Sequence, residues 1–222
     1  MAHMTPRQWV MRMAIVRKIF LTPLVVAILL LLSACTTPLS YNPQYQGRLR
    51  PIPGAQAEGR IVILTSPADD SYVFTGNPTS FTGGATKISI PLGLITKEIS
   101  HNAFVRILKD GSLQLNAIPT DLPYRVIVKP RISSFSYAYN QLQNAGLLVT
   151  PQVDISLSIE VLDASQKVIL TNTYQSGTKD GDSYFMSGSP GERINKLAHE
   201  VITELVNQAA EEVYYLISNQ DS

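Results

Sequence analysis

The sequence predicts an α+β fold: an antiparallel sheet of about four strands, with two helices packed on one face. Residues 149–161 alternate between apolar and polar side chains, which is typical of a strand with one buried face. A polar turn at 163–166 leads into a second apolar run at 167–175, as in a β-hairpin. Residues 190–217 carry apolar side chains at helical spacing, which predicts that the second helix is long and C-terminal.

The first strand is predicted at residues 60–65, where a continuous apolar, β-branched run precedes Ser66-Pro67. Such a run is typical of a strand that is buried on both faces. The first helix is predicted at residues 91–109, because Pro91 suits a helix start and apolar residues then recur on one face. That face consists of Ile95, Ile99, Ala103 and Ile107.

Residues 124–139 predict a long strand with an irregularity in its middle. The apolar side chains fall on even positions up to Ile132 and on odd positions from Phe135 onward. A β-bulge shifts the phase of a strand by one residue, so we expect a bulge at Ser133-Ser134. Two separate short strands would give the same pattern and are the alternative.

The long helix is expected to begin at Ser189. This serine can cap the helix, Pro190 suits the first helical position, and Glu192 would complete a capping box. The predicted order is therefore strand, helix, three consecutive antiparallel strands and helix. This order favours one sheet with an apolar side on which both helices lie.

The N-terminal 34 residues have the organisation of a secretory signal peptide. Four basic residues precede an apolar segment at 19–32, which is followed directly by Ser33-Ala34-Cys35. The segment has 14 residues and is interrupted by Thr22-Pro23. A membrane-spanning helix needs about 20 apolar residues, so a signal peptide is favoured over a transmembrane anchor.

Leu32, Ser33, Ala34 and Cys35 resemble the lipobox of bacterial lipoproteins. The resemblance implies cleavage before Cys35, the only cysteine in the chain. It also implies a covalent diacylglycerol and an N-acyl chain on that cysteine, which would attach the protein to a membrane. By the sorting rule of such lipoproteins, Thr36 instead of aspartate after the cysteine implies the periplasmic face of the outer membrane.

Three regions follow from this interpretation. Residues 1–34 are the leader, residues 35–59 are the acylated cysteine and a tether, and residues 60–218 form a single periplasmic α+β domain. The tether is rich in proline and polar residues, which cannot form a core. We expect it to be a flexible coil that spans on the order of 25–30 Å.

The charge of the mature chain argues against nucleic acid as a partner. After the leader, 14 basic and 17 acidic residues remain, which gives a net charge of −3. Nucleic-acid binding requires a clustered basic face. The single cysteine also excludes an intramolecular disulfide.

The sequence contains no motif for catalysis, metal binding or phosphate binding. His101 and His199 lie on predicted helices, and we expect them to be surface or core-edge residues. Asp180 and Asp182 offer too few oxygen ligands in sequence for a calcium site. We therefore expect no enzymatic activity, no catalytic residue and no metal. A hydrolase would need a pocket that joins a serine or an aspartate to one of the two histidines.

Aromatic residues near predicted strand ends and loops are the candidates for partner binding. Tyr137 and Tyr139 end a strand, and Tyr184 and Phe185 lie in a loop. Aromatic side chains are common at protein interfaces. The alternative is that they cover the edge of the core.

The lipobox, the proline-rich tether, the antiparallel strands and the long C-terminal helix resemble small periplasm-facing lipoproteins of Gram-negative envelopes. The nearest in pattern are the YajG-like lipoproteins and the auxiliary lipoproteins of lipid-transport ABC systems. This resemblance implies a non-enzymatic accessory or assembly component of an envelope transport or secretion system, with an envelope protein as partner. The alternative is a periplasmic lipid carrier, which predicts a sizeable apolar cavity between the helices and the sheet.

Overall fold

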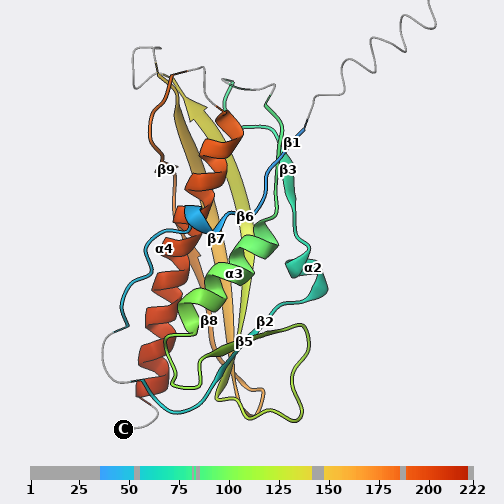
Figure 1. The fold of residues 1–222 in the computed structure, drawn as a ribbon, viewed down its shortest axis with the longest axis vertical. Helices are drawn as coiled ribbons and strands as arrows, with labels where there is room; N and C mark the ends of the chain where they lie inside the picture. The colour runs from blue at the N-terminus through green and yellow to red at the C-terminus, as the bar shows by residue number, and fades with distance from the viewer. Residues whose placement is uncertain are drawn as a thin grey trace, which may run out of the picture. The chain divides into compact units, whose positions relative to one another are not determined.

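The computed structural model describes residues 36–52, 56–81, 83, 86–141, 148–185 and 189–219 (Figure 1). The elements in chain order are β1 (Thr37–Pro38), η1 (Pro43–Tyr45), β2 (Ile61–Leu64), α2 (Pro67–Asp70), β3 (Phe74–Gly76), β4 (Ile88–Ile90), α3 (Leu92–Phe104), β5 (Ser112–Leu115), β6 (Val126–Asn140), β7 (Thr150–Asp163), β8 (Val168–Gln175), β9 (Lys179–Asp180) and α4 (Pro190–Ser218). The predicted α+β class is confirmed, and the sheet is mixed.

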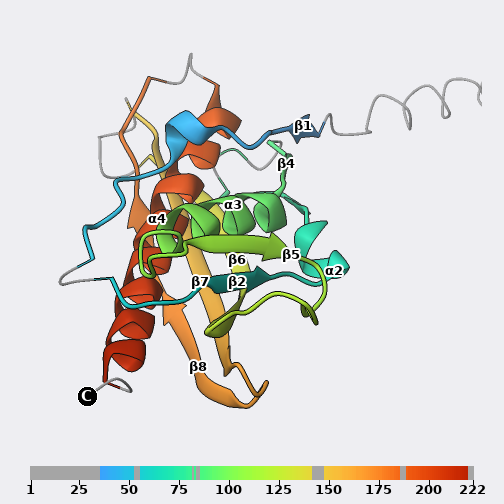
Figure 2. The same ribbon diagram turned by 60° about the horizontal axis from the view of Figure 1, so that its bottom comes forward.

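The main sheet has six strands in the order β5-β2-β6-β7-β8, with β9 paired to β7. The strands β6 and β7 are antiparallel to each other, and so are β7 and β8, as predicted. The prediction of a purely antiparallel sheet is wrong at β2, which runs parallel to both β5 and β6. The helix α3 lies between β2 and β5 in the chain, and a crossover of this kind returns the chain in the same direction. Figure 2 shows β2 and β5 side by side beneath α3.

The long strand β6 contains the predicted bulge. Ile132 pairs with Leu157 and Ser134 pairs with Ser156, so Ser133 is the extra residue. The bulge keeps the apolar side chains on one face, because Val128 before it and Phe135 after it are both buried. The alternative of two short strands is therefore wrong.

Both helices pack on the same face of the main sheet, as predicted. The helix α3 packs against β6 and β2, α4 packs against β7 and β8, and the helices contact each other. One hydrophobic cluster runs through this layer and joins the sheet to both helices. A lipid carrier would need an apolar cavity here, so this cluster counts against that alternative in the part of the chain that is described.

A second, three-stranded sheet has the order β1-β4-β3. Its strand β1 comes from the segment that was expected to be a flexible tether. Thr37 pairs with Ile88 and Pro38 with Ser89, in parallel. The tether prediction for residues 35–59 is thus wrong where the chain is described between 36 and 52, because this segment belongs to the fold.

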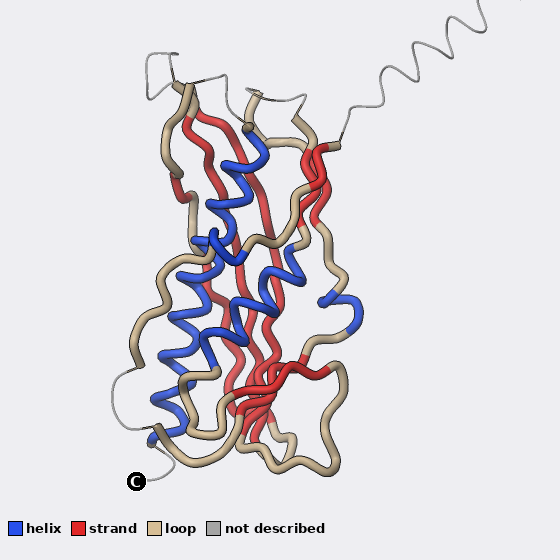
Figure 3. The backbone as a smooth tube through the Cα atoms, in the orientation of Figure 1, coloured by secondary structure: helices blue, strands red, loops and turns tan. Residues whose placement is uncertain are grey.

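We call residues 36–52 the strap. After β1 the strap runs along α4, as Figure 3 shows. Its Leu39 is buried in the main hydrophobic cluster, close to Gly191 at the start of α4. The composition of the strap suggested a coil because many of its contacts are backbone hydrogen bonds to side chains of α4, which carry no signature in the sequence of the strap itself.

Candidate functional site

The lipobox residues Leu32, Ser33, Ala34 and Cys35 lie outside the described residues. The first described residue is Thr36, and β1 begins at Thr37. Only Thr36 therefore separates Cys35 from hydrogen-bonded structure. Within the described residues, no helix combines the length and the apolar character that are needed to cross a bilayer.

Three of the four aromatic candidates for partner binding are buried. The exposed fraction of the side chain is 1% for Tyr137, 3% for Tyr139 and 7% for Tyr184. The Tyr137 hydroxyl lies 3.0 Å from the Gly76 carbonyl oxygen and 2.6 Å from that of Thr86. Burial raises the pKa of Tyr137 to about 12.

The prediction that these tyrosines meet a partner directly is therefore corrected. Tyr137 fastens the small sheet to the end of β6, and its ring packs edge-on against Tyr139 and Phe74. Tyr184 exchanges two backbone hydrogen bonds with Val149, and the Arg193 guanidinium lies 5.5 Å from its ring centre. These side chains form the edge of the core, which was the alternative.

Phe185 remains an accessible candidate, with 70% of its side chain exposed. A second exposed aromatic residue, Phe81, is fully accessible on the connection between β3 and β4. In the sequence it stands with Tyr72 and Phe74 in an irregular Thr/Gly-rich stretch, as part of a further aromatic cluster that is a candidate for recognition. No periodic pattern there distinguishes an exposed ring from a buried one.

The two histidines have separate structural roles. His199 is completely buried on α4, where Nε2 lies 3.2 Å from the Asn42 backbone nitrogen and Nδ1 lies 2.8 Å from the Asn195 carbonyl oxygen. The neutral ring with its proton on Nδ1 satisfies both contacts, accepting from Asn42 and donating to Asn195. His101 Nδ1 lies 2.9 Å from the Ser112 hydroxyl, which links α3 to β5.

His199 belongs to a polar row on α4 whose members are four residues apart and hold the backbone of the strap. The row consists of Asn195, His199, Thr203 and Asn207. Asn195 donates to the Ser40 carbonyl, and Thr203 accepts from the Gly47 backbone N–H. Asn207 does both, since its Nδ2 donates to the Arg48 carbonyl and its Oδ1 accepts from the Arg50 N–H. These polar side chains are buried because the strap covers them.

The face of the main sheet that α3 and α4 leave open carries a groove of about 600 Å³. Its floor consists of polar side chains in two rows across β6, β7 and β8: Lys129, Glu160 and Thr171, then Arg131, Ser158 and Thr173. Lys129 Nζ donates to Glu160 Oε1 at 2.7 Å, and the Ser158 and Thr173 hydroxyls are 3.1 Å apart. Arg131 is exposed and has no ion pair within the described residues.

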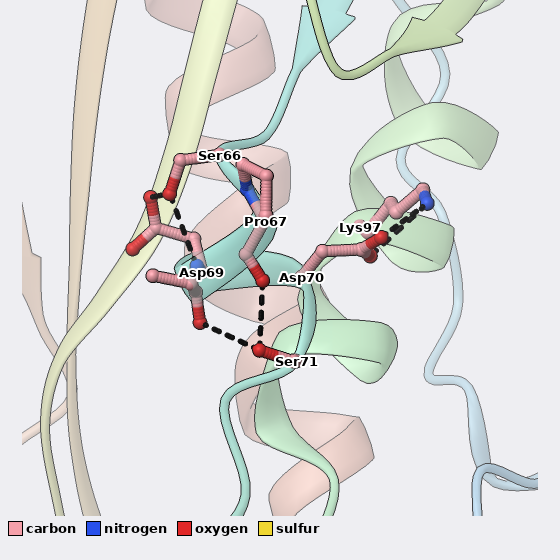
Figure 4. A network of polar contacts seen from close by, with 7 residues as sticks. Ser66, Pro67, Asp69, Asp70, Ser71 and Lys97 are labelled. Atoms are coloured by element: carbon pink, nitrogen blue, oxygen red, sulfur yellow. Dashed lines mark hydrogen bonds and ion pairs between the residues drawn. The ribbon is translucent and has the colours of Figure 1, made fainter.

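One wall of this groove is formed by residues 64–69, which end β2 and begin α2. Ser66 caps α2: its hydroxyl accepts from the Asp69 N–H at 3.1 Å and donates to the Asp69 carboxylate at 2.6 Å (Figure 4). Lys97 Nζ lies 3.0 Å from both carboxylate oxygens of Asp70 and so ties α2 to α3.

Gly93 allows α2 to lie directly against α3. A Cβ atom at this position would be 2.0 Å from the Asp69 carbonyl oxygen, so no larger residue fits without moving the backbone. The Gly93 N–H also donates to the Tyr72 carbonyl at 2.9 Å. The wall of the groove is therefore held at a fixed position relative to the core.

The groove presents hydroxyl, carboxylate and cationic side chains. Neither histidine is among its lining residues, so it does not join a nucleophile to an imidazole. Across the described residues, no three histidine, cysteine, aspartate or glutamate side chains are placed to hold a metal ion. Hydroxyls, one ion pair and one unpaired guanidinium provide hydrogen bonds to a polar or acidic partner.

Comparison with known proteins gives similarities in structure alone. No family model and no curated protein matches the chain. A Xanthomonas campestris protein of the family DUF330 is 14% identical, with a TM-score of 0.49 over 84% of this chain and 98% of the other. A minor lipoprotein from Acinetobacter baumannii is 11% identical, with a TM-score of 0.34 over 70% of this chain and 91% of the other. At these levels the comparisons assign the chain to no family.

Proposed function

We propose that the protein is an outer-membrane-anchored lipoprotein that serves as a non-enzymatic accessory or assembly component of an envelope transport or secretion system. The observation that carries the proposal is the sequence Leu32-Ser33-Ala34-Cys35 after a basic and apolar leader. The strap supports it, because β1 lies only two residues after Cys35, where an anchor would join the domain.

The groove is the surface that we assign to the protein partner. Its floor lies on rigid strands and its wall is fixed to α3 through Asp70 and Lys97. Arg131 is available for a carboxylate of the partner, which it can bind with two parallel hydrogen bonds. A non-enzymatic role is consistent with this surface, because binding requires complementary shape and charge and no activated nucleophile.

The anchor is tested by replacing Cys35 with serine and separating membranes from the soluble fraction. We expect the unaltered protein in the outer-membrane fraction with the mass of three added acyl chains, and C35S without that mass and outside that fraction. The matched control is Thr36→Ser, which changes the neighbouring residue and keeps the cysteine. Outer-membrane attachment of C35S equal to that of the unaltered protein would contradict the proposal.

The partner surface is tested with a photo-crosslinking residue in living cells. Placed at Thr173, on the floor of the groove, it should give a discrete product with a component of an envelope transport or secretion system. The same residue at Lys167, which is exposed on the turn between β7 and β8, should not give that product. Arg131→Glu should remove the product. A product that persists in R131E, or forms equally at position 167, would rule out the groove.

A further inference from the structure

The start of the strap is held by its pairing with β4. The Thr37 N–H donates to the Lys87 carbonyl at 2.9 Å, and β1 runs parallel to β4. Followed backward from Thr37, the chain therefore heads toward the residues that precede β4. Consecutive Cα atoms are about 3.8 Å apart, so the Cα of Cys35 lies within about 8 Å of that of Thr37. The domain has no long tether between itself and this cysteine.

Phe81 lies on the connection that leads into β4, and this connection is fastened to the end of β6. The Thr79 N–H donates to the Tyr137 carbonyl, and the Ser80 hydroxyl accepts from the Tyr139 N–H at 2.9 Å. The Phe81 side chain, next in the chain, is fully exposed. An aromatic ring is thus held in solvent by a backbone that is hydrogen-bonded to a buried strand.

Phe185 lies at the same end of the β6–β7 pair. Tyr139 pairs with Pro151 near the start of β7, and the neighbouring Val149 is hydrogen-bonded to Tyr184. Phe185 follows Tyr184 and has 70% of its side chain exposed. Figure 1 shows β1, the far end of β6 and the start of α4 at one end of the domain, opposite the C-terminal end of α4.

We propose that this end of the domain, which we call the aromatic end, lies against the lipid bilayer, with Phe81 and Phe185 in its interfacial region. The inference rests on the proposed lipid anchor, since a lipidated Cys35 would hold the start of β1 within a few ångströms of the membrane surface. Exposed aromatic rings beside such an anchor can bury apolar area among the headgroups and upper acyl chains.

The contact is apolar in character. Charges of both signs lie near the aromatic end, as in the pair formed by Lys196 and Asp182 at 3.8 Å, and Arg193 is turned over the Tyr184 ring. No basic cluster at this end attracts anionic lipid among the described residues. Contact with the bilayer should therefore be insensitive to salt, in contrast to binding through a basic patch.

Single tryptophan residues can test this contact. Trp9, the only tryptophan in the sequence, lies in the leader. The unaltered protein without its leader therefore has no tryptophan and gives the background emission. The test variants are Phe81→Trp and Phe185→Trp, and the matched control is Tyr215→Trp, an exposed aromatic position near the C-terminal end of α4. Each full-length lipoprotein is purified and placed in phosphatidylethanolamine–phosphatidylglycerol vesicles, with and without bromine on the acyl chains.

We expect bromine to quench the emission at positions 81 and 185 by roughly half and to leave position 215 unchanged, because the bromine atoms lie in the acyl region that only the interfacial rings approach. An equal loss of emission through bromine at positions 81 and 215 would overturn the inference. The inference would also be overturned if position 81 were protected from a water-soluble quencher and yet not quenched by bromine. That result would indicate that another protein covers Phe81.

The failure of this inference is distinguishable from the failure of the anchor. Mass analysis of the same preparations shows whether Cys35 carries acyl chains. If the protein is lipidated but bromine does not quench the test variants, the proposed function stands and the aromatic end does not contact the membrane. A protein without acyl chains contradicts the proposed function, and the quenching comparison between positions 81 and 215 still decides the location of the aromatic end.

Discussion

At the scale of single residues, His199 shows how a polar side chain in an apolar stripe can be entirely structural. It lies between the rings of Tyr41, stacked at 5.6 Å, and Tyr45, edge-on at 5.8 Å. Its two nitrogens bond one backbone group of the strap and one of α4. The sequence predicted a surface or core-edge residue, whereas the strap buries His199 completely. The sequence did not predict the partner of His199, because Asn42 is 157 residues away.

The burial of His199 leads to a prediction about pH. Desolvation lowers the pKa of His199 below its ordinary value of 6.5, although the Asn195 carbonyl and the charge of Glu192 oppose this effect. The unfolded chain therefore takes up a proton at a higher pH than the folded chain. The stabilisation by neutral His199 is complete above about pH 6.5 and is lost as the pH falls below it.

We expect the free energy of unfolding in urea to be about 1 kcal/mol lower at about pH 5.5 than at about pH 7.5 because of this residue. His199→Gln, which stays neutral, should lose that part of the difference. His101→Gln is the control, since it leaves His199 in place and should keep the full difference. An identical pH dependence in H199Q and the unaltered protein would assign the effect to other groups.

At the scale of elements, local patterns predicted what local interactions determine. The phase change between Ile132 and Phe135 correctly predicted the bulge in β6, and the alternation at 149–161 correctly predicted β7. The strand β5 was not predicted because it has only four residues, which are too few to show the alternation of apolar and polar side chains that marks a strand. The polar row on α4 was the feature of the sequence from which a covering segment such as the strap could have been predicted. Polar residues at intervals of four, lying inside an apolar helix, need partners from elsewhere in the chain.

A substitution at Asn207 tests whether the polar row on α4 holds the strap in place. Asn207→Ala removes the hydrogen bonds to Arg48 and Arg50, and we expect a loss of about 1–2 kcal/mol in the free energy of unfolding. The amide protons of Gly47 and Arg50 should exchange faster while those of α4 keep their protection. The control is Gln208→Ala on the next position of the helix, which should leave both quantities unchanged. Unaltered exchange in N207A would show that the row does not hold the strap.

At the scale of the whole molecule, the sequence predicted the layers but not every connection between them. Two helices on one side of a sheet follow from the apolar stripes on α3 and α4. The parallel direction of β2 depends on β5, which the sequence did not reveal. The open groove could not be predicted either, because it joins residues of α2, β6, β7 and β8 that lie far apart in the sequence. The aromatic end likewise joins residues near positions 37, 81 and 185.

Removing residues 36–52 tests whether the strap is part of the cooperative fold. The deletion takes Leu39 out of the core and exposes the polar row on α4. We expect a loss of roughly 3–6 kcal/mol in the free energy of unfolding, from buried apolar area and several hydrogen bonds. The control inserts a Gly-Ser segment between Thr36 and Thr37, which keeps the strap and should keep the stability. Equal stability of the deletion and the control would show that the strap is an appendage.

If the protein is exported as we propose, the contacts of the strap also order the events of that export. Asn42 and Arg50 would then cross the inner membrane early, whereas His199 and Asn207, 157 residues later, would cross near the end. The strap therefore has no docking site until the rest of the domain has been translocated. During that interval the proposed anchor residue Cys35 would precede a segment that has not yet docked. The strap would dock when α4 arrives, so the last part of the chain to be made would set the distance between the domain and the proposed anchor.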